Sequence, residues 1–231
     1  MNSVKIKRVE KVSPRKKAVK PAPKRAYHHG DLREKLIAAT EALIRERGVD
    51  GFSLREVARR AGVSPAAPAH HFGDARGLLS EVALLGFQEF GDALAAGDAL
   101  GGSDPAARLY EQGKAYVNFA LKNPARFQLM FSNGKCDPAY KNLDEISNRS
   151  FRVLEKAIRA AMGLTGSDEM PPDGYGYLMA VWSCVHGFAH LALGGQFDGP
   201  AKMRGMKGEI SKTFLPLMLA HLPEPPAQKT L

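Results

Sequence analysis

The chain has 231 residues, of which 44% are hydrophobic, and its formal net charge is +9. This length supports a sizeable core in one or two domains. No apolar run approaches the roughly 18 residues that span a bilayer, and no apolar stretch follows the basic N-terminus as in a signal peptide. Cys136 and Cys184 have no zinc-site spacing. We therefore expect a cytoplasmic protein with reduced cysteines, no metal site and no membrane partner.

The excess positive charge lies in the N-terminal segment. Residues 1–26 contain ten Lys or Arg and one acidic residue, whereas residues 27–231 carry equal numbers of both charges. Three prolines and the lack of apolar periodicity predict that residues 1–26 are disordered. The segment is either a solubilising tail or start-site artefact, or an arm that lies along DNA phosphates or enters the minor groove. In the second case Lys24 and Arg25 are candidate DNA contacts.

The first predicted helix begins at Asp31 and ends at Gly48. Asp31 and Glu34 have the spacing of a helix cap and its reciprocal partner. Apolar residues such as Leu36 and Leu43 recur at helical spacing between these ends. A compact helix is therefore expected before residue 48.

Residues 52–72 predict two short helices joined by a tight turn. Ser53 and Glu56 have the spacing of a capping box, and Gly62 stands where a left-handed residue ends the first helix. Ser64 is the expected cap of the second helix, with Pro65 at its first position. This order is that of a helix-turn-helix, whose second helix enters the major groove of DNA. The alternative is a generic helical corner.

The helix-turn-helix interpretation assigns roles to polar and small residues. The expected backbone contacts are Tyr27, Ser53 and Arg55, and the expected contacts of the second helix are Ser64, Ala66, Ala67, His70 and His71. Small apolar side chains suit thymine methyl groups, and a histidine can donate to a purine acceptor. Arg59 and Arg60 are either further phosphate contacts or partners of Glu56.

The remainder of the chain continues the helical pattern. A long fourth helix is expected after Asp74, and further helices after Pro105 and Asn123, through Ile146–Ile158, over 175–193 and up to about Leu222, with a turn over 196–200. No strand alternation appears. The fold class is therefore all-α with about nine helices, in domains at 27–73 and 74–222, followed by a disordered tail at 223–231.

Two segments carry a resemblance to a known family. Residues 27–90, with Ala58-Arg59-Arg60-Ala61-Gly62-Val63-Ser64 and His71-Phe72-Gly73-Asp74, resemble the N-terminal DNA-binding domain of the tetracycline-repressor (TetR) family. Residues 180–192 resemble the Trp-x-x-x-His-Gly signature of one regulatory-domain subgroup. The second helix departs from the family pattern, because Ala69, His70 and Ala75 replace residues that usually touch phosphates.

The resemblance implies a dimeric, ligand-responsive transcriptional regulator, most often a repressor, that binds a palindromic operator in double-stranded DNA. It implies a cavity for a small organic effector between the C-terminal helices, with no other cofactor. The candidate lining residues are Phe90, Tyr116, Phe119, Phe127, Phe131, Trp182 and His186. The last two long helices are the expected dimer interface, with Leu178, Cys184, Leu191, Phe214, Leu217 and Met218 as contributors.

Two other function classes are carried as alternatives. The basic arm alone would suit a protein that compacts DNA without sequence preference. A helical enzyme or carrier would use the same cavity, but the chain has no catalytic constellation: His186, His190 and Asp198 lack a nucleophile elbow. The i, i+4 spacing of the two histidines also fits two metal ligands, yet no third ligand accompanies them.

Overall fold

The computed structural model describes residues 29–166, 168–203 and 210–226, and these residues form ten α-helices and one short 3-10 helix, η1, with no strand among them. The elements are α1 His29–Arg47, α2 Leu54–Ala61, α3 Ala67–Phe72, α4 Ala75–Leu100, α5 Pro105–Lys122, α6 Pro124–Met130, η1 Tyr140–Asn142, α7 Leu143–Ala161, α8 Pro172–Leu193, α9 Asp198–Met203 and α10 Ile210–Leu219. The all-α expectation is confirmed. The extra helix is α9, which forms where a turn was expected over 196–200.

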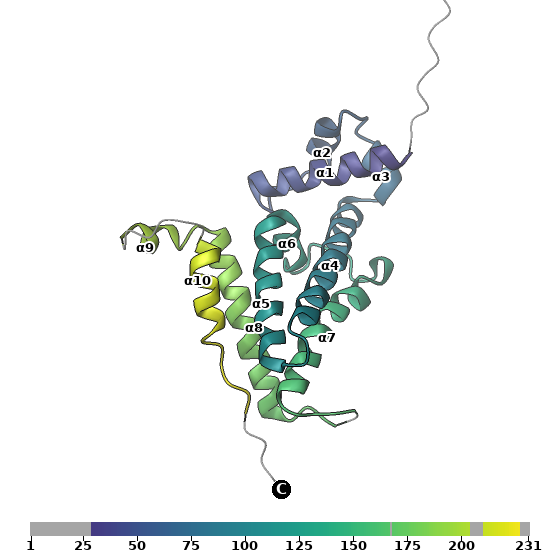
Figure 1. Ribbon diagram of the computed structural model, residues 1–231. Coiled ribbons are helices and arrows are strands. Elements are labelled where there is room, and N and C mark those ends of the chain that lie inside the picture. Colours follow the sequence, from purple (N-terminus) through teal and green to yellow (C-terminus); the bar gives the residue numbers. More distant parts are fainter. Residues whose placement is uncertain (1–28, 167, 204–209, 227–231) are drawn as a thin grey trace, which may run out of the picture.

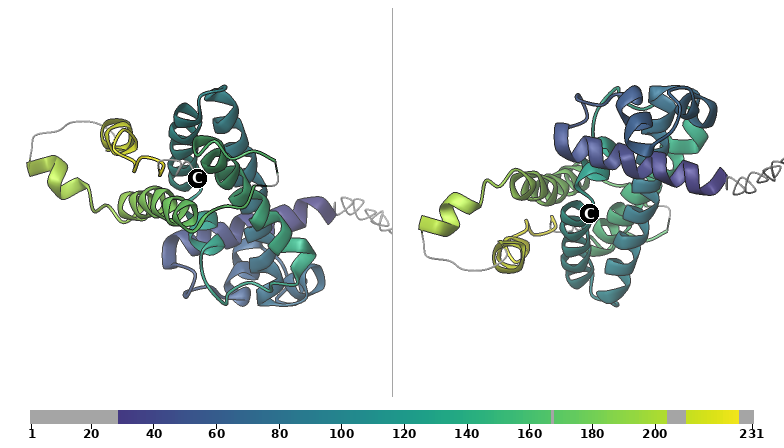
Figure 2. Two further views of the ribbon diagram at one scale, coloured as in Figure 1. Left: turned by 90° about the horizontal axis from the view of Figure 1, so that it is seen from below. Right: turned by 90° about the horizontal axis from the view of Figure 1, so that it is seen from above.

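The helices form a small head and a larger body (Figure 1). In the head, α1, α2 and α3 pack together at one end of the molecule. The 26-residue α4 starts beside α3 and runs through the body, where it packs against α5, α6 and α7. Helices α8 and α10 cover the far side of α5, and α9 projects away from them (Figure 2). One helix therefore extends from the head deep into the body.

The caps of the head helices follow from particular side chains. The Ser53 hydroxyl accepts a hydrogen bond from the Glu56 N–H, and Asp74 accepts one from the Gly77 N–H. Gly62 has φ 68°, and the N–H groups of Gly62 and Val63 donate to the carbonyls of Arg59 and Ala58. This pair of bonds is the Schellman motif, which a glycine makes without steric cost. These predicted caps are confirmed.

Two predicted helix starts are wrong. The helix α3 begins at Ala67, and Ser64 makes no side-chain cap. A helix capped by Ser64 would need its first backbone bond from residue 68, and Pro68 has no N–H. The first bond instead runs from the His70 N–H to the Ala66 carbonyl. Asp31 lies inside α1, because the buried side chains of Leu32 and Leu36 extend the apolar face of this helix upstream.

Three glycines show how closely the body helices approach. A Cβ atom on Gly86 would lie 2.7 Å from the Met130 sulfur, and one on Gly91 would lie 3.1 Å from the Ser150 hydroxyl. Both glycines therefore permit close packing of α4 on α6 and α7. By contrast, a Cβ on Gly187 of α8 would meet nothing within 4 Å among the described residues.

The cores of head and body are continuous. Leu36, Val57 and Phe72 of the head are buried in the same cluster as Leu78 of α4 and Leu129 of α6. Apolar burial of this kind stabilises the folded state by about 1.5–3 kcal/mol per large side chain. Packing of these buried side chains therefore fixes the head against α4 and α6.

The helix α8 is long and strongly apolar, with 22 residues. By length and composition it could cross a membrane, although no such segment was expected from the sequence. A core helix of a folded domain passes the same test, and Leu178, Val181 and Val185 of α8 are buried against the rest of the body. We therefore describe α8 as a body helix. The predicted arm at 1–26, which includes Lys24 and Arg25, lies outside the described residues, and so do Tyr27 and residues 227–231.

Candidate DNA-binding surface and aromatic pocket

The predicted DNA-contacting side chains of the head are solvent-accessible. Ser53 and Arg55 are exposed on α2, and Ser64, Ala66 and His70 are exposed at and beyond the turn before α3. Ala67 and His71 are half-buried. Helix α2 contacts α3, so these residues belong to one helix-turn-helix unit. Within the described part of the chain, Arg55 has no acidic hydrogen-bond partner, unlike Arg59 and Arg60.

Arg59 and Arg60 bind acidic groups of the head itself. Arg59 donates two hydrogen bonds to the Glu56 carboxylate, at 2.9 and 2.7 Å. Arg60 donates one to Glu56 and two to Glu46 of α1, at 3.0, 2.8 and 2.6 Å. The hydrogen bonds from Arg59, and to a smaller extent the one from Arg60, lower the pKa of Glu56 to about 2. Glu56 is therefore a partner for the arginines, and the reciprocal half of the predicted capping box is not formed.

Arg55→Ala is expected to weaken binding to every duplex alike and to lower the salt slope of binding by about one unit, because one phosphate contact is lost. Arg60→Ala is the matched control on the same helix. Since Arg60 joins α2 to α1, its loss should lower the melting temperature while the salt slope stays unchanged. Fluorescence anisotropy over a salt series, with thermal melts, measures both effects. An unchanged slope in Arg55→Ala would remove this residue from the interface.

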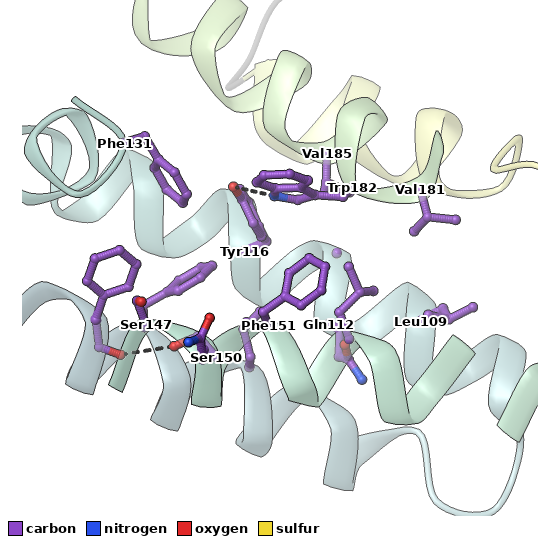
Figure 3. A pocket seen from close by; sticks show the side chains of 16 residues that line it. Leu109, Gln112, Tyr116, Phe131, Ser147, Ser150, Phe151, Val181, Trp182 and Val185 are labelled. Carbon is purple, nitrogen blue, oxygen red and sulfur yellow. Dashed lines mark hydrogen bonds between the residues drawn. The ribbon is translucent and has the colours of Figure 1, made fainter. Parts of the chain in front are cut away.

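An apolar pocket lies in the body between α4, α5, α7 and α8. It is a cavity of about 210 Å³. Its walls include Phe87 and Phe90 of α4, and Trp182, Val181 and Val185 of α8 face Ser150 and Phe151 of α7 across it (Figure 3). The full lining, which we call the aromatic pocket, is Phe87, Phe90, Leu94, Leu109, Gln112, Gly113, Tyr116, Phe131, Ser147, Asn148, Ser150, Phe151, Leu154, Val181, Trp182 and Val185. A concave, mostly apolar site with few polar groups is typical of small-molecule binding.

Two residues of the pocket wall, Tyr116 and Trp182, form a hydrogen-bonded trio with His186 behind them. The Tyr116 hydroxyl lies 2.6 Å from Nδ1 of His186. It also accepts a longer bond of 3.4 Å from Nε1 of Trp182 (Figure 3). Burial raises the pKa of Tyr116, so this hydroxyl keeps its proton and donates to His186. Burial, and then His190, lower the pKa of His186, which favours the neutral ring that accepts at Nδ1. The Trp-x-x-x-His spacing thus places two side chains of α8 around one hydroxyl of α5.

The predicted pocket residues divide into two groups. Phe90, Tyr116, Phe131 and Trp182 line the aromatic pocket, whereas Phe119, Phe127 and His186 lie in the aromatic cluster behind its wall. Phe127 is fully buried, with its ring centroid 5.6 Å from that of His186. Sequence reasoning missed Phe87 and Phe151, although both stand at helical spacing from predicted apolar positions. It also missed Gln112, whose polar type gave no signal.

The two histidines of α8, His186 and His190, make contacts with aromatic rings. The rings of His186 and His190 are 4.5 Å apart, and His190 also packs against Phe127. Among the described residues, no group of three or more His, Cys, Asp or Glu side chains could hold a metal ion. This arrangement gives the pair a packing role within the body.

Ion pairs connect the head to the body beneath it. Arg126 of α6 donates to Glu41 of α1 at 2.6 Å and pairs with Glu89 of α4 at 2.6 Å. The buried Glu81 of α4 binds Arg33 of α1 on one side and Lys141 of η1 on the other. Phe131, at the end of α6, lines the aromatic pocket. The helices that line or adjoin the pocket are therefore bonded directly to the head.

A helix-turn-helix head on a helical body with an apolar, ligand-sized pocket defines a DNA-binding protein of the regulatory class. Comparison with known proteins supports this class. Residues 36–82 match the family model of bacterial regulatory proteins, tetR family. Residues 109–206 match the model of the tetracyclin repressor-like C-terminal domain.

Individual relatives support the same assignment. The chain is 30% identical over 149 residues to the HTH-type transcriptional regulator BetI of Yersinia pestis (strain Pestoides F), covering 58% of this chain and 75% of that protein. A solved structure of a protein with unknown function from Rhodococcus sp. RHA1 is 32% identical, with a TM-score of 0.64 over 86% of this chain and 99% of that one. A tetR-family regulatory protein from Rhodococcus RHA1 has the same fold at 19% identity, with a TM-score of 0.62 over 83% and 96% of the two chains.

The chain belongs to the TetR family of bacterial transcriptional regulators. It is a DNA-binding regulator of transcription, and its relatives indicate no enzymatic activity.

Proposed function

We propose that this regulator is a repressor that binds a palindromic operator as a homodimer and releases it when a small organic molecule fills the aromatic pocket. The observation that carries the proposal is the path of α4. This helix begins at the head, capped by Asp74, and places Phe87 and Phe90 in the pocket wall. A ligand that fits one tilt of α4 better than another would shift the population of head positions. Equal affinity for both would change nothing.

The outer faces of α8 and α10 support a dimer. Leu191 of α8 is 46% exposed and Leu217 of α10 is 57% exposed. Cys184 is exposed, and Phe214 and Met218 are half-buried. Leu178 was expected at the same interface, but it is fully buried within the body. Apolar side chains at this density suit a two-fold contact between copies, which would place two heads on a symmetric site.

The proposal also includes the domain boundary, the regulatory-domain subgroup and the cellular location. The division between a DNA-binding domain at 27–73 and a regulatory domain at 74–222 falls at Gly73, immediately before α4. The bonds of Trp182 and His186 to Tyr116 support membership of the Trp-x-x-x-His-Gly subgroup. A regulator that acts on the chromosome belongs in the cytoplasm.

Selection of bound sequences from a random duplex pool tests specific dimeric binding. The proposal predicts a two-fold symmetric motif with half-sites about one helical turn, or a multiple of one turn, apart. A pool without an enriched motif would refute the repressor and favour DNA compaction by the basic arm, the alternative that the charge of residues 1–26 supports.

Substitution on α3 tests base reading. His70→Ala and Ala67→Ser are expected to change the base preferred at one or two positions of each selected half-site, by about 1–3 kcal/mol per position. Affinity for random duplex should remain, since neither side chain contacts phosphate in this account. Repeating the pool selection with each variant measures the effect. A uniform loss over all sequences would argue against base reading by these residues.

A further inference from the structure

The lining of the aromatic pocket carries no formal charge. Its residues include six aromatic rings and contain no Asp, Glu, Lys, Arg or His. A buried charge without a partner is strongly disfavoured, so an uncharged occupant fits these walls. The rings of Phe90 and Tyr116 already meet edge to face, with centroids 4.9 Å apart. A further ring inserted among them would gain the same kind of contact.

One buried polar atom in the lining lacks a partner. Gln112 of α5 is 3% exposed, and its Nε2 donates to Asp98 of α4 at 2.7 Å. Its Oε1 is the one buried side-chain nitrogen or oxygen within the described residues that has no hydrogen-bond partner. A buried acceptor without a donor costs about 1–3 kcal/mol and is rare in folded proteins.

The orientation of the Gln112 amide is fixed by an ion pair. Arg108 donates to both oxygens of Asp98, at 2.8 and 2.7 Å. Burial opposes ionisation of Asp98, but the hydrogen bonds from Arg108 and Gln112 outweigh it and keep the pKa of this carboxyl below its ordinary value. An ionised carboxylate only accepts, so the NH₂ group of Gln112 must face Asp98. The amide oxygen is therefore left for a donor from elsewhere.

Asn148 lines the pocket but is exposed to solvent, and the hydroxyl groups of the wall already make hydrogen bonds. The Tyr116 hydroxyl bonds to His186 and Trp182, and the Ser150 hydroxyl donates to the Phe87 carbonyl at 3.2 Å. Ser147 donates to the Asp144 carbonyl at the rim. Gln112 thus stands as the unsatisfied hydrogen-bonding position of the pocket interior.

We infer that the effector of this regulator is an uncharged, mainly aromatic molecule that donates one hydrogen bond, from a hydroxyl or amide N–H, to Oε1 of Gln112. The inference rests on the proposed ligand response and names its chemistry. The cavity of about 210 Å³ is somewhat larger than the ~150 Å³ that holds benzene, so the molecule has on the order of ten non-hydrogen atoms.

Three probes of similar shape test this chemistry on the full chain. The probe p-propylphenol has the donor, p-propyltoluene lacks it, and p-propylbenzoate carries a charge. The chain has one tryptophan, Trp182, which lines the pocket, so its fluorescence reports occupancy. We expect p-propylphenol to bind about tenfold more tightly than p-propyltoluene, the value of one hydrogen bond. We expect p-propylbenzoate to bind more weakly than either.

A variant assigns the preference to Gln112. In Gln112→Met, which keeps the side-chain length without the acceptor, the roughly tenfold preference for the phenol should disappear while p-propyltoluene binds as before. Leu109→Met is the matched control on α5: it changes the wall but not the acceptor, and should keep the preference. The comparison of probes on the unaltered chain stands even if a variant folds poorly.

Several outcomes would overturn the inference. These are equal binding of phenol and toluene, tighter binding of the benzoate, a preference that survives in Gln112→Met, or no binding of any probe. The proposed repressor function is read separately, from the anisotropy of a labelled selected duplex after the phenol is added. Binding without release would leave the ligand chemistry standing and contradict the proposed response, whereas release by a charged metabolite would do the reverse.

Discussion

Removing residues 1–26 is expected to weaken DNA binding strongly and to flatten its dependence on salt. This segment holds ten Lys or Arg and one acidic residue, which together account for the formal net charge of +9. Each neutralised phosphate contributes about 0.9 to the slope of log affinity against log salt. If the arm neutralises about six phosphates, the slope should fall by about five units when it is removed.

We expect a large loss of DNA affinity because the head itself offers few free cations to phosphates. Residues 64–75, which include α3, contain no Lys or Arg. Arg60 is bound to Glu46 and Glu56, and Arg76 donates to the Cys136 carbonyl. Few cations of the described head therefore remain for phosphates, and Arg55 is the main candidate on α2.

A charge-neutral arm of the same length is the control for this deletion. In that variant the ten Lys and Arg residues of 1–26 and Glu10 are replaced by Gln and Ser, and it should behave like the deletion in anisotropy titrations over a salt series. An unchanged slope in both variants would show that the grip on phosphates comes from the body or the head alone.

Phe127→Ala is expected to lower the free energy of unfolding by about 3–5 kcal/mol, the usual cost of emptying a buried aromatic site. Phe127 is fully buried, and its ring packs against Tyr116, Phe131 and His190. Domains are marginally stable, by about 5–15 kcal/mol, so this variant should lose much of its margin. Chemical denaturation measures the loss.

Phe131→Ala is the matched comparison for Phe127→Ala. Phe131 is half-buried at the end of α6 and lines the aromatic pocket, so its truncation should cost less stability and enlarge the cavity. Phe127→Leu, which keeps much of the volume, should fall between the two. Equal losses for Phe127→Ala and Phe131→Ala would contradict the division between cluster and pocket wall.

Local signals in the sequence predict much of the head. Ser53, Gly62 and Asp74 do what their residue types and spacings predict, because caps depend on a few neighbouring atoms. The exceptions also have local causes. The helix α3 begins later than predicted because Pro68 has no N–H. Glu56 does not complete the capping box because its carboxylate binds two arginines.

The aromatic pocket is less predictable, because periodicity shows an apolar face without showing what covers it. Phe127 and Phe131 are spaced i, i+4 near the end of α6, yet only Phe131 lines the cavity. The role of Gln112 depends on Asp98, fourteen positions earlier on another helix. The pairs of Arg126 with Glu41 and Glu89 likewise join three helices that no short pattern brings together.

Competition between the selected duplex and random duplex of equal length measures whether this chain reads a particular DNA sequence. We expect the full chain to prefer the selected duplex by about 10³-fold or more near physiological salt. We also expect the preference to survive removal of residues 1–26, even as both affinities fall. A preference near unity, or one that disappears with the arm, would contradict this expectation.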